Sequence, residues 1–370
     1  MDWANGRLIN ALFKNKEYQW SLAIFSDPVR VSSYDYQISP EYLFKLPYPF
    51  NYGAGLRNSW KIYQQLRQIA SRHDVLIVQL PIISFIPLLF IRKRIIYHVC
   101  ANVSTAAANP YKYRGVRRMA SGIFAWFMTW VFRQLFARSN SRLIVNGGEL
   151  GQVFRSFNPE VVVSSSIEST ELAREHAMTT RSEDVFRLLF IGRPSMEKGI
   201  NVLMEAYSRL IEQGVPVQLE MIGVTKEELA TGLRSLHIPD KHLDKVIFHG
   251  FLSWSEPFRN IIRKSHALVM CSVSEGTPRV ILEAMSQGCP VIATAVGGVP
   301  TVVNEGNGIL IPPGNAEGLA DAVKYLVINE QARIKMAHAG LQTASMYTLD
   351  KFASVFLDLL HKLKTHDDAK

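Results

Sequence analysis

Between Phe186 and Pro313 the chain alternates short apolar runs with segments whose apolar residues recur at helical spacing. The apolar runs are FRLLFIG, VQLEMIG, KVIFHGF, HALVMCSV, PVIATA and GILIPP. The segments between them include INVLMEAYSRLIEQG, SEPFRNIIRKS and PRVILEAMSQG, and a helical run starting with AEGLADAV follows. Strands separated by helices of about 10–15 residues indicate βαβ units. This half therefore predicts an α/β fold with a parallel sheet covered on both faces.

The first half shows the same alternation in a looser form. Its apolar runs QWSLAIF, DVLIVQL, RIIYHVC, RLIVNG and EVVVSS read as strands. A length of 370 residues suits two domains better than one. The polar stretch 164–182 predicts the boundary, with one domain at 1–165 and a second at 166–345. Residues 346–370 predict a last helix that packs back on the first domain.

The composition is that of a globular chain, with 48% hydrophobic and 20% charged residues. The three cysteines, Cys100, Cys271 and Cys289, lie far apart, which argues against both a disulfide framework and a cysteine metal site. The first residues lack the apolar core of a signal peptide. We therefore expect a cytoplasmic protein, at or near the inner face of a membrane.

Positive charge is concentrated in the first half. Residues 1–165 hold 20 lysines and arginines against 8 acidic residues, whereas residues 166–370 hold 21 against 24. Between Asp74 and Glu149 there is no acidic residue, and there are ten basic ones. Such a bias predicts an acidic partner: an anionic membrane, a phosphorylated acceptor or a nucleic acid. Because no recognition motif accompanies the charge, we expect no nucleic-acid partner.

Two apolar segments bear on membrane contact. Residues 75–91 are fewer than the ~20 that a span needs and include prolines, so a strand, a turn and a buried helix explain them better than a span. Residues 112–138 join basic and aromatic residues, as an interfacial helix does. The alternative for this segment is a core helix with basic ends. The absence of nearby acids favours the interfacial reading, with an anionic membrane as partner. The residues that carry it are Lys112, Arg114, Arg117, Arg118, Trp126 and Trp130.

The motif with the clearest chemistry is SVSEGTPRVILEAM, residues 272–285. Its turn, Glu275 to Pro278, follows a strand, and Pro278 suits a first helical position. Gly276 and Thr277 complete this turn. The backbone N–H groups that follow, near Arg279 and Val280, are unpaired and predict an anion site.

Two carboxylates flank the predicted anion site. They would repel a phosphate, so we expect Glu275 and Glu283 to accept hydroxyl groups on either side of it. A ligand with a sugar, a pyrophosphate and a ribose in series would satisfy this pattern. Taken alone, Glu283 also fits a solvated position on a helix.

A second motif, IGRPSMEKGINVL, places Arg193 and Lys198 in a turn between a strand and a helix. Two cations at a strand's carboxyl end can neutralise a pyrophosphate, each contributing about 1.5–3 kcal/mol. Taken alone, a basic turn also fits a solvated loop.

Together these residues resemble the signature of glycosyltransferase family 4, whose GT-B fold has two Rossmann-like doubly wound domains facing a central cleft. The resemblance runs from about Phe186 to Gly314 and includes GCPVIAT, the Gly297-Gly298 turn and GILIPPGN. It implies that Arg193 and Lys198 hold the diphosphate of a nucleotide-sugar donor. It also implies that Glu275 binds the donor sugar, that Glu283 binds the ribose, and that the backbone from Gly276 to Val280 contacts sugar and phosphate.

The first domain matches this family less well. His98 ends the strand RIIYHV, where the family often has a histidine facing the donor sugar, but a lone histidine that closes a strand is the alternative. The opening strand and Gly-rich loop of the family are not recognisable before Gln19. Gly53-Ala54-Gly55 comes too late in the chain to be that loop.

The resemblance implies transfer of a sugar to a glycan or lipid-linked acceptor with retention at the anomeric carbon. The candidate catalytic residues are Glu275 and His98. The leaving diphosphate would help to deprotonate the acceptor. No Asp-x-Asp pair occurs, so we expect no metal and no other cofactor. We expect a role in cell-surface polysaccharide or lipopolysaccharide synthesis. The alternative is a non-catalytic, transferase-like subunit that binds nucleotide sugar or membrane.

Overall fold

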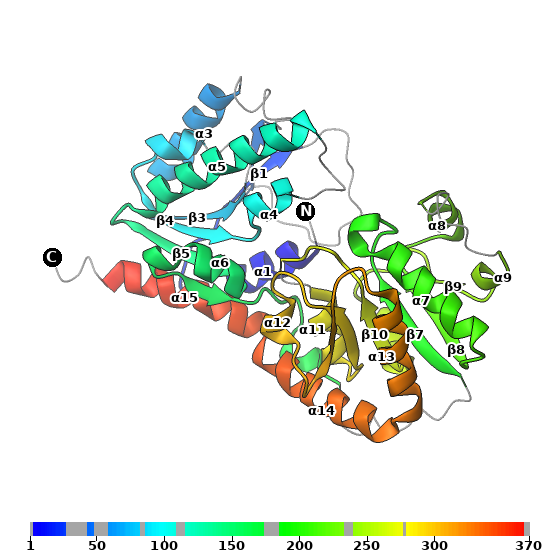
Figure 1. The fold of residues 1–370 in the computed structure, drawn as a ribbon. Coiled ribbons are helices and arrows are strands. Elements are labelled where there is room, and N and C mark those ends of the chain that lie inside the picture. The colour runs from blue at the N-terminus through cyan, green and yellow to red at the C-terminus, as the bar shows by residue number, and fades with distance from the viewer. Residues whose placement is uncertain are drawn as a thin grey trace. The chain divides into compact units, whose positions relative to one another are not determined.

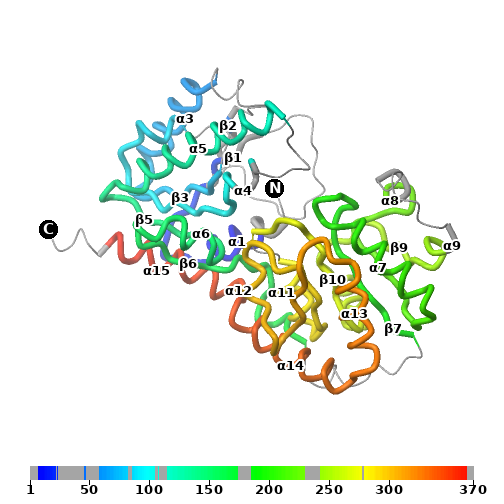
Figure 2. Tube along the Cα trace, in the orientation of Figure 1, coloured from blue at the N-terminus to red at the C-terminus, as the bar shows by residue number. Residues whose placement is uncertain are grey.

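The computed structural model describes residues 3–26, 43–47, 58–81, 86–108, 115–173, 185–232, 240–276 and 279–365. The chain divides into two compact units (Figure 1; Figure 2). Unit 1 comprises Met1–Ser166 and Leu349–Lys370, and unit 2 comprises Ile167–Thr348. Each unit is built on parallel strands, so the predicted α/β class is confirmed.

Unit 2 contains a six-stranded parallel sheet in the order β12-β11-β10-β7-β8-β9. The central strands are buried on both faces, which is why they read as continuous apolar runs. All six expected strands are present, although the run KVIFHGF gives only a two-residue strand. They are β7 (Phe186–Ile191), β8 (Val217–Ile222), β9 (Ile247–Phe248), β10 (Ala267–Met270), β11 (Val291–Thr294) and β12 (Gly308–Ile311).

Helices cover both faces of this sheet (Figure 1). Leu203, Met204 and Tyr207 are fully buried and belong to the core of unit 2. The predicted C-terminal helical run is divided at Asn329. The helical segments are η4 (Ser169–Glu171), η6 (Met196–Lys198), α7 (Ile200–Glu212), α8 (Lys226–Gly232), α9 (Asp240–Leu243), α10 (Glu256–Lys264), α11 (Arg279–Ser286), α12 (Val299–Val302), α13 (Ala316–Ile328) and α14 (Glu330–Met346).

Unit 1 contains a four-stranded parallel sheet in the order β3-β4-β5-β6 and a separate parallel pair, β1 and β2. Each of the five runs read as strands in this half forms one. Residues 53–55 lie outside the described residues. The strands are β1 (Leu22–Ser26), β2 (Leu43–Pro47), β3 (Val75–Leu80), β4 (Arg94–Val99), β5 (Ser141–Asn146) and β6 (Glu160–Val162).

Alternate residues of β4 face two different helical layers, because successive side chains of a strand point to opposite faces. Ile95, Tyr97 and Val99 pack with α3 (Ser59–Ser71), η2 (Ile86–Phe90) and α5 (Val116–Phe136). Ile96 packs instead with α1 (Trp3–Phe13) and α15 (Leu349–Thr365). The other helical segments of unit 1 are α4 (Val103–Ala108), α6 (Gly148–Val153) and η3 (Arg155–Phe157).

The two apolar segments tested for membrane spans have defined places in unit 1. Residues 75–91 contribute β3 and η2, with residues 82–85 outside the described part. Residues 116–136 form α5. Within the described ranges, no helix has the combined length and hydropathy that crossing a bilayer requires.

Candidate functional site

The strand order of unit 2 reverses between β7 and β10. Strands β8 and β9 follow on one side of β7, and β10, β11 and β12 lie on the other. In open α/β sheets, ligands bind at the carboxyl ends of the strands at such a reversal. The loop after β7 carries Arg193 and Lys198, and the loop after β10 carries Glu275. The topology therefore collects these predicted residues at the expected binding position.

Lys198 and Glu275 are in direct contact. The Lys198 Nζ donates to Glu275 Oε1 at 2.5 Å, and the two side chains are 32% and 12% exposed. Ser272 Oγ donates to the same carboxylate oxygen at 2.6 Å. The pattern predicted separate roles for the lysine and the glutamate and did not predict this contact. The carboxylate is thus held by groups from both loops.

The loop after β7 lies against the end of β10 because Gly199 allows a close backbone approach. Gly199 has a φ of +68°, and a Cβ atom there would lie 1.9 Å from the Cys271 carbonyl oxygen. Only glycine combines this backbone conformation with this contact. The Val273 N–H donates to the Glu197 carbonyl oxygen at 3.0 Å beside it. This packing places Lys198 next to Glu275.

The predicted Gly297-Gly298 turn supports the same site from the other side. Gly297 has a φ of +52°, and a Cβ atom there would lie 1.7 Å from the Glu275 carbonyl oxygen. The Gly298 N–H donates to the Gly276 carbonyl oxygen at 2.8 Å. The loops after β7, β10 and β11 therefore pack around Glu275 as one structure.

Ser272 and Thr294 are site-supporting residues that the sequence reasoning missed. Both side chains are fully buried. Thr294 Oγ1 donates to the Ser272 carbonyl oxygen at 2.5 Å, and Ser272 in turn donates to Glu275. The available signal was their position: Thr294 ends β11, Ser272 follows the end of β10, and the carboxyl ends of neighbouring parallel strands meet at one edge of a sheet.

The other predicted donor residues lie on the same loops or on α11. Arg193 is exposed in the loop after β7, and Gly276 is exposed after Glu275. Val280 lies in the first turn of α11, and Glu283 is half-buried one turn later. Thr277 and Pro278 lie outside the described residues.

His98 lies in unit 1 and is surrounded by apolar groups. Its side chain is 4% exposed, and its ring packs against Phe352 and Phe356 of α15 at centroid distances of 5.6 and 5.3 Å. The Cys100 Sγ lies 3.5 Å from both ring nitrogens. Burial lowers the pKa of His98 to about 4. The imidazole is therefore neutral at pH 7, and its contacts are those of a core residue.

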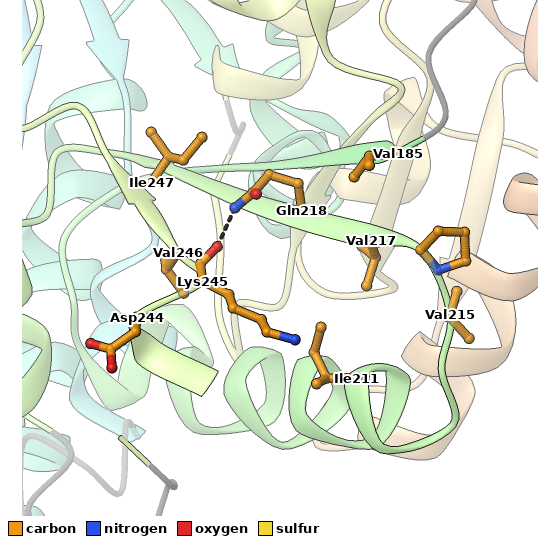
Figure 3. Close-up of a pocket in the computed structure, with 10 residues that line it drawn as sticks. Val185, Ile211, Val215, Val217, Gln218, Asp244, Lys245, Val246 and Ile247 are labelled. Carbon is orange, nitrogen blue, oxygen red and sulfur yellow. Dashed lines mark hydrogen bonds between the residues drawn. The ribbon is translucent and has the colours of Figure 1, made fainter. Parts of the chain in front are cut away.

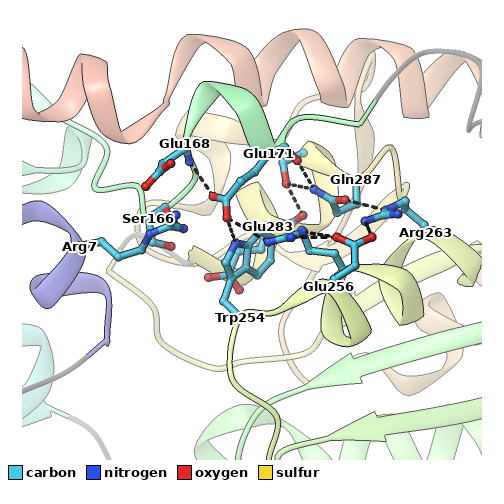
Figure 4. Close-up of polar contacts among 11 residues, drawn as sticks. Arg7, Ser166, Glu168, Glu171, Trp254, Glu256, Arg263, Glu283 and Gln287 are labelled. Carbon is cyan, nitrogen blue, oxygen red and sulfur yellow. Dashed lines mark hydrogen bonds and ion pairs between the residues drawn. The ribbon is translucent and has the colours of Figure 1, made fainter. Parts of the chain in front are cut away.

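A polar cluster ties η4, just after the start of unit 2, to α10 and to the end of α11 (Figure 4). Glu171 Oε1 accepts from Trp254 Nε1 and from Arg259, each at 3.0 Å. The Glu171 carbonyl oxygen accepts from Gln287 Nε2 at 2.8 Å. Gln287 also accepts from Arg263 Nε at 3.0 Å. Because Gln287 directly follows α11, the cluster fixes the far end of the helix that carries Glu283.

The segment 248–253, which begins at the end of β9, is held by a buried carboxylate. Glu220 on β8 accepts from His249 Nε2 at 2.7 Å and pairs with Arg187 at 3.4 Å. The hydrogen bond from His249 lowers the pKa of Glu220, and the charges of His249 and Arg187 act in the same direction. Glu220 thus links the end of β9 to the centre of the sheet.

A hollow of about 360 Å³ lies at the amino ends of β7, β8 and β9 (Figure 3). Val185, Val217 and Ile247 line it, and the Gln218 side chain donates to the Lys245 carbonyl oxygen at its edge. The carboxyl ends of the strands are at the opposite edge of the sheet, so this hollow is separate from Glu275. Among the described residues, no group of three His, Cys, Asp or Glu side chains is arranged to hold a metal ion.

Residues 185–329 match the model of a family described as Glycosyl transferases group 1. Among curated relatives, D-inositol 3-phosphate glycosyltransferase of Corynebacterium urealyticum is 28% identical over 184 residues, covering 48% of this chain and 43% of the relative. The lipopolysaccharide core biosynthesis glycosyltransferase LpsE of Rhizobium meliloti is 28% identical over 205 residues, covering 54% of this chain and 58% of the relative. The chain thus spans about half the length of the curated relatives it matches.

Solved structures share the fold over nearly the whole chain. Sucrose-phosphate synthase from Thermosynechococcus elongatus superposes with a TM-score of 0.73 at 17% identity, covering 97% of this chain and 92% of the other. Anabaena HepE in complex with UDP and glucose gives 0.68 at 17% identity, covering 96% and 95%. These similarities confirm the predicted GT-B class with two Rossmann-like domains.

Proposed function

We propose that the chain is a retaining glycosyltransferase of the family described as Glycosyl transferases group 1, whose model matches residues 185–329. It would transfer a sugar from a nucleotide-sugar donor to a glycan or lipid-linked acceptor. The observation that carries the proposal is the contact between Lys198 and Glu275 at the strand-order reversal of unit 2. A cation and a carboxylate at this point match the phosphate and hydroxyl groups of such a donor.

The remaining hydrogen-bonding capacity of the pair supports this division of roles. A lysine ammonium has three donors, and Lys198 uses one of them on Glu275. The other two suit phosphate oxygens. The carboxylate of Glu275 retains acceptor sites for sugar hydroxyls, because Lys198 and Ser272 both contact one oxygen. The complex of HepE with UDP and glucose supports a nucleotide-sugar donor for this fold.

The proposed reaction breaks the bond between the anomeric carbon and the donor phosphate and forms a bond to the acceptor oxygen on the same face. The acceptor proton goes to the leaving diphosphate. Arg193, Lys198 and the N-terminus of α11 would stabilise the negative charge on the leaving group. No metal and no other cofactor is part of the proposal. His98 has no assigned step because it packs in the core of unit 1.

The proposed acceptor belongs to cell-surface polysaccharide or lipopolysaccharide synthesis, on the cytoplasmic face of a membrane. The name of the relative LpsE supports this acceptor class. The ten basic residues between Asp74 and Glu149, without an acidic one, support an anionic membrane surface as a partner of residues 112–138.

The alternative is a non-catalytic subunit that binds nucleotide sugar or membrane and supports a partner enzyme. The observation that favours it is the apolar burial of His98, the candidate catalytic residue of unit 1. The two functions differ in one measurable property. A transferase hydrolyses its donor slowly without acceptor, whereas a binding subunit leaves the donor intact.

A thermal-shift panel of nucleoside diphosphates and nucleotide sugars tests the proposal, because a ligand of the folded state raises its melting temperature. The donor so identified is then incubated with wild type, Glu275→Gln and Glu305→Gln. Glu305 is an exposed glutamate of unit 2 and provides the matched control. We expect donor hydrolysis to be lost in Glu275→Gln and kept in Glu305→Gln. If no nucleotide stabilises the protein, the proposal is wrong, and binding without turnover would favour the non-catalytic subunit.

A further inference from the structure

Helix α5 has two apolar faces, and the described residues of unit 1 bury only one of them. Met128, Val131, Phe132 and Leu135 are fully buried in the core of unit 1. A second row of apolar side chains remains 49–77% exposed. Its spacing of three and four residues puts the row on one side of the helix. We call this row the α5 stripe: Val116, Met119, Ile123, Trp126 and Trp130.

The α5 stripe is a continuous surface and not a set of scattered exposed residues. At a rise of about 1.5 Å per residue, Val116 and Trp130 lie about 21 Å apart along the helix. Phe127, which stacks on Trp130 with a ring-centroid distance of 6.1 Å, is also 39% exposed and widens it. Apolar surfaces of this extent on soluble domains mark contact sites for proteins, ligands or membranes.

A second exposed apolar pair lies on the helical layer that contains α5. Trp60 on α3 and Phe90 on η2 are 66% and 65% exposed. Tyr63 connects them, with ring centroids 5.5 Å from Trp60 and 6.1 Å from Phe90. Residues of α3, η2 and α5 pack into one core against the same face of the sheet, as the ribbon of unit 1 shows (Figure 1). This helical layer therefore carries three exposed tryptophans, Trp60, Trp126 and Trp130.

The charges around the α5 stripe bear on the kind of partner that it fits. Arg117 and Arg118 are exposed in the first turn of α5, and Arg133 is exposed near its end. The whole segment from residue 75 to residue 148 contains no acidic residue. Tryptophan favours the boundary between lipid headgroups and acyl chains, and arginine favours anionic phosphates at the same depth. A protein partner would need a surface that is apolar along the length of the stripe and acidic beside it. An anionic bilayer offers acyl chains and phosphates over its whole surface.

We propose that the α5 stripe is the membrane-binding surface of this protein. Helix α5 lies in the headgroup layer of an anionic phospholipid bilayer, with the stripe toward the acyl chains and the arginines at the phosphates. This proposal rests on the proposed function in one respect, which is that membrane binding would bring the enzyme to a lipid-linked acceptor. Its binding to lipid requires no donor and no turnover.

Co-sedimentation of the full chain with vesicles tests this surface. Neutral vesicles contain phosphatidylcholine alone, and anionic vesicles contain phosphatidylcholine and phosphatidylglycerol at about 7:3. The stripe variant is Ile123→Glu with Trp126→Glu, and the charge variant is Arg117→Glu with Arg118→Glu. The matched control, Tyr325→Glu with Ile328→Glu, changes two exposed apolar residues of α13 in unit 2.

We expect wild type and the α13 control to bind anionic vesicles at least tenfold more strongly than neutral ones, with less binding as salt rises. The stripe and charge variants should each lose at least tenfold of this binding and keep the wild-type thermal shift with nucleotide. Equal pelleting with both vesicle types, or full binding by the stripe variant, would overturn the proposal. So would a concentration-dependent dimer that disappears in the stripe variant while vesicles are not bound, because the stripe would then be an interface between copies of this chain.

The two proposals fail separately. Vesicle binding through the α5 stripe without any nucleotide binding would contradict the proposed transferase and leave this surface in place. Nucleotide turnover without vesicle binding would contradict this surface and leave the transferase in place.

Discussion

At the scale of single residues, Lys198 and Glu275 form a pair whose members are expected to bind different parts of one donor. Their contact was not predicted because the motifs lie 77 positions apart and each was interpreted by itself. The topology brings them together, since β7 and β10 are neighbours in the sheet. The residue types were therefore predictable from the sequence, but the contact required the strand order.

Replacing either member of the pair separates the two roles. Lys198→Ala should weaken binding of the nucleoside diphosphate and of its sugar form alike, by about 10- to 100-fold, because one charge-assisted bond contributes about 1.5–3 kcal/mol. Glu275→Gln should weaken binding of the sugar form only, because the carboxylate is proposed to accept sugar hydroxyls, and removing its negative charge does not disfavour the phosphates. Isothermal titration with both ligands measures this. Equal effects of both variants on both ligands would contradict the assigned roles.

His98 provides a prediction that concerns the stability of unit 1. Burial lowers its pKa to about 4 in the folded protein, against an ordinary value of 6.5. Between these values the unfolded chain binds a proton and the folded chain does not, so stability falls as the pH falls from about 6.5 to 4. The free energy of unfolding should be about 3 kcal/mol lower at pH 4 than above pH 6.5 from this group.

NMR of protein with labelled histidine should show the His98 imidazole neutral down to about pH 5. In His98→Phe, the free energy of unfolding measured with denaturant should lose the part of its pH dependence that His98 contributes. A His98 signal that titrates near pH 6.5 would show that the imidazole is accessible to water.

At the scale of elements, the strands were predictable because buried parallel strands are apolar along their whole length. β9 is shorter than its apolar run suggests, and the C-terminal helical run breaks at Asn329. The sequence predicts an interfacial helix within residues 112–138, with a core helix as the alternative. The structure shows one face of α5 buried and another exposed, which the sequence could not separate because both faces are apolar.

The close packing of the site loops depends on Gly297. A Cβ atom there would lie 1.7 Å from the Glu275 carbonyl oxygen, and the residue has a positive φ. Gly297→Ala should therefore move the Glu275 turn and lower the stability of unit 2 by at least about 1–2 kcal/mol from the backbone conformation alone. We expect donor binding to fall at least tenfold in titration calorimetry.

Gly314→Ala is the control for this substitution. Gly314 also has a positive φ, but a Cβ atom there would meet nothing within 4 Å. Gly314→Ala should lower stability through the same backbone strain as Gly297→Ala, but it should keep donor binding. If both variants bind the donor like wild type, the close approach at Gly297 has no role in the site.

At the scale of the whole molecule, α15 belongs to unit 1, although unit 2 separates it in the sequence from the rest of unit 1. Phe356 is 1% exposed and packs against His98 of β4 and Phe352 of α15. Phe356→Ala should destabilise unit 1 by about 3–5 kcal/mol. Calorimetry should show a lower transition for unit 1 and an unchanged nucleotide-dependent shift for unit 2.

Ser354→Ala is the matched change for Phe356→Ala, because Ser354 is exposed on the same helix. It should leave both transitions in place. A loss of nucleotide stabilisation in Phe356→Ala would show that the two units do not respond separately.

The return of α15 to unit 1 also affects the order in which the protein is completed during synthesis. Domains generally fold as they leave the ribosome, the N-terminal one first. Here unit 1 begins first but lacks Phe352, Phe356 and Leu360 of its core until α15 has been made. We therefore expect unit 2 to reach its native state while unit 1 still exposes the apolar face of its sheet. During that interval the earlier-made half of the chain would be the one most exposed to chaperones and to aggregation.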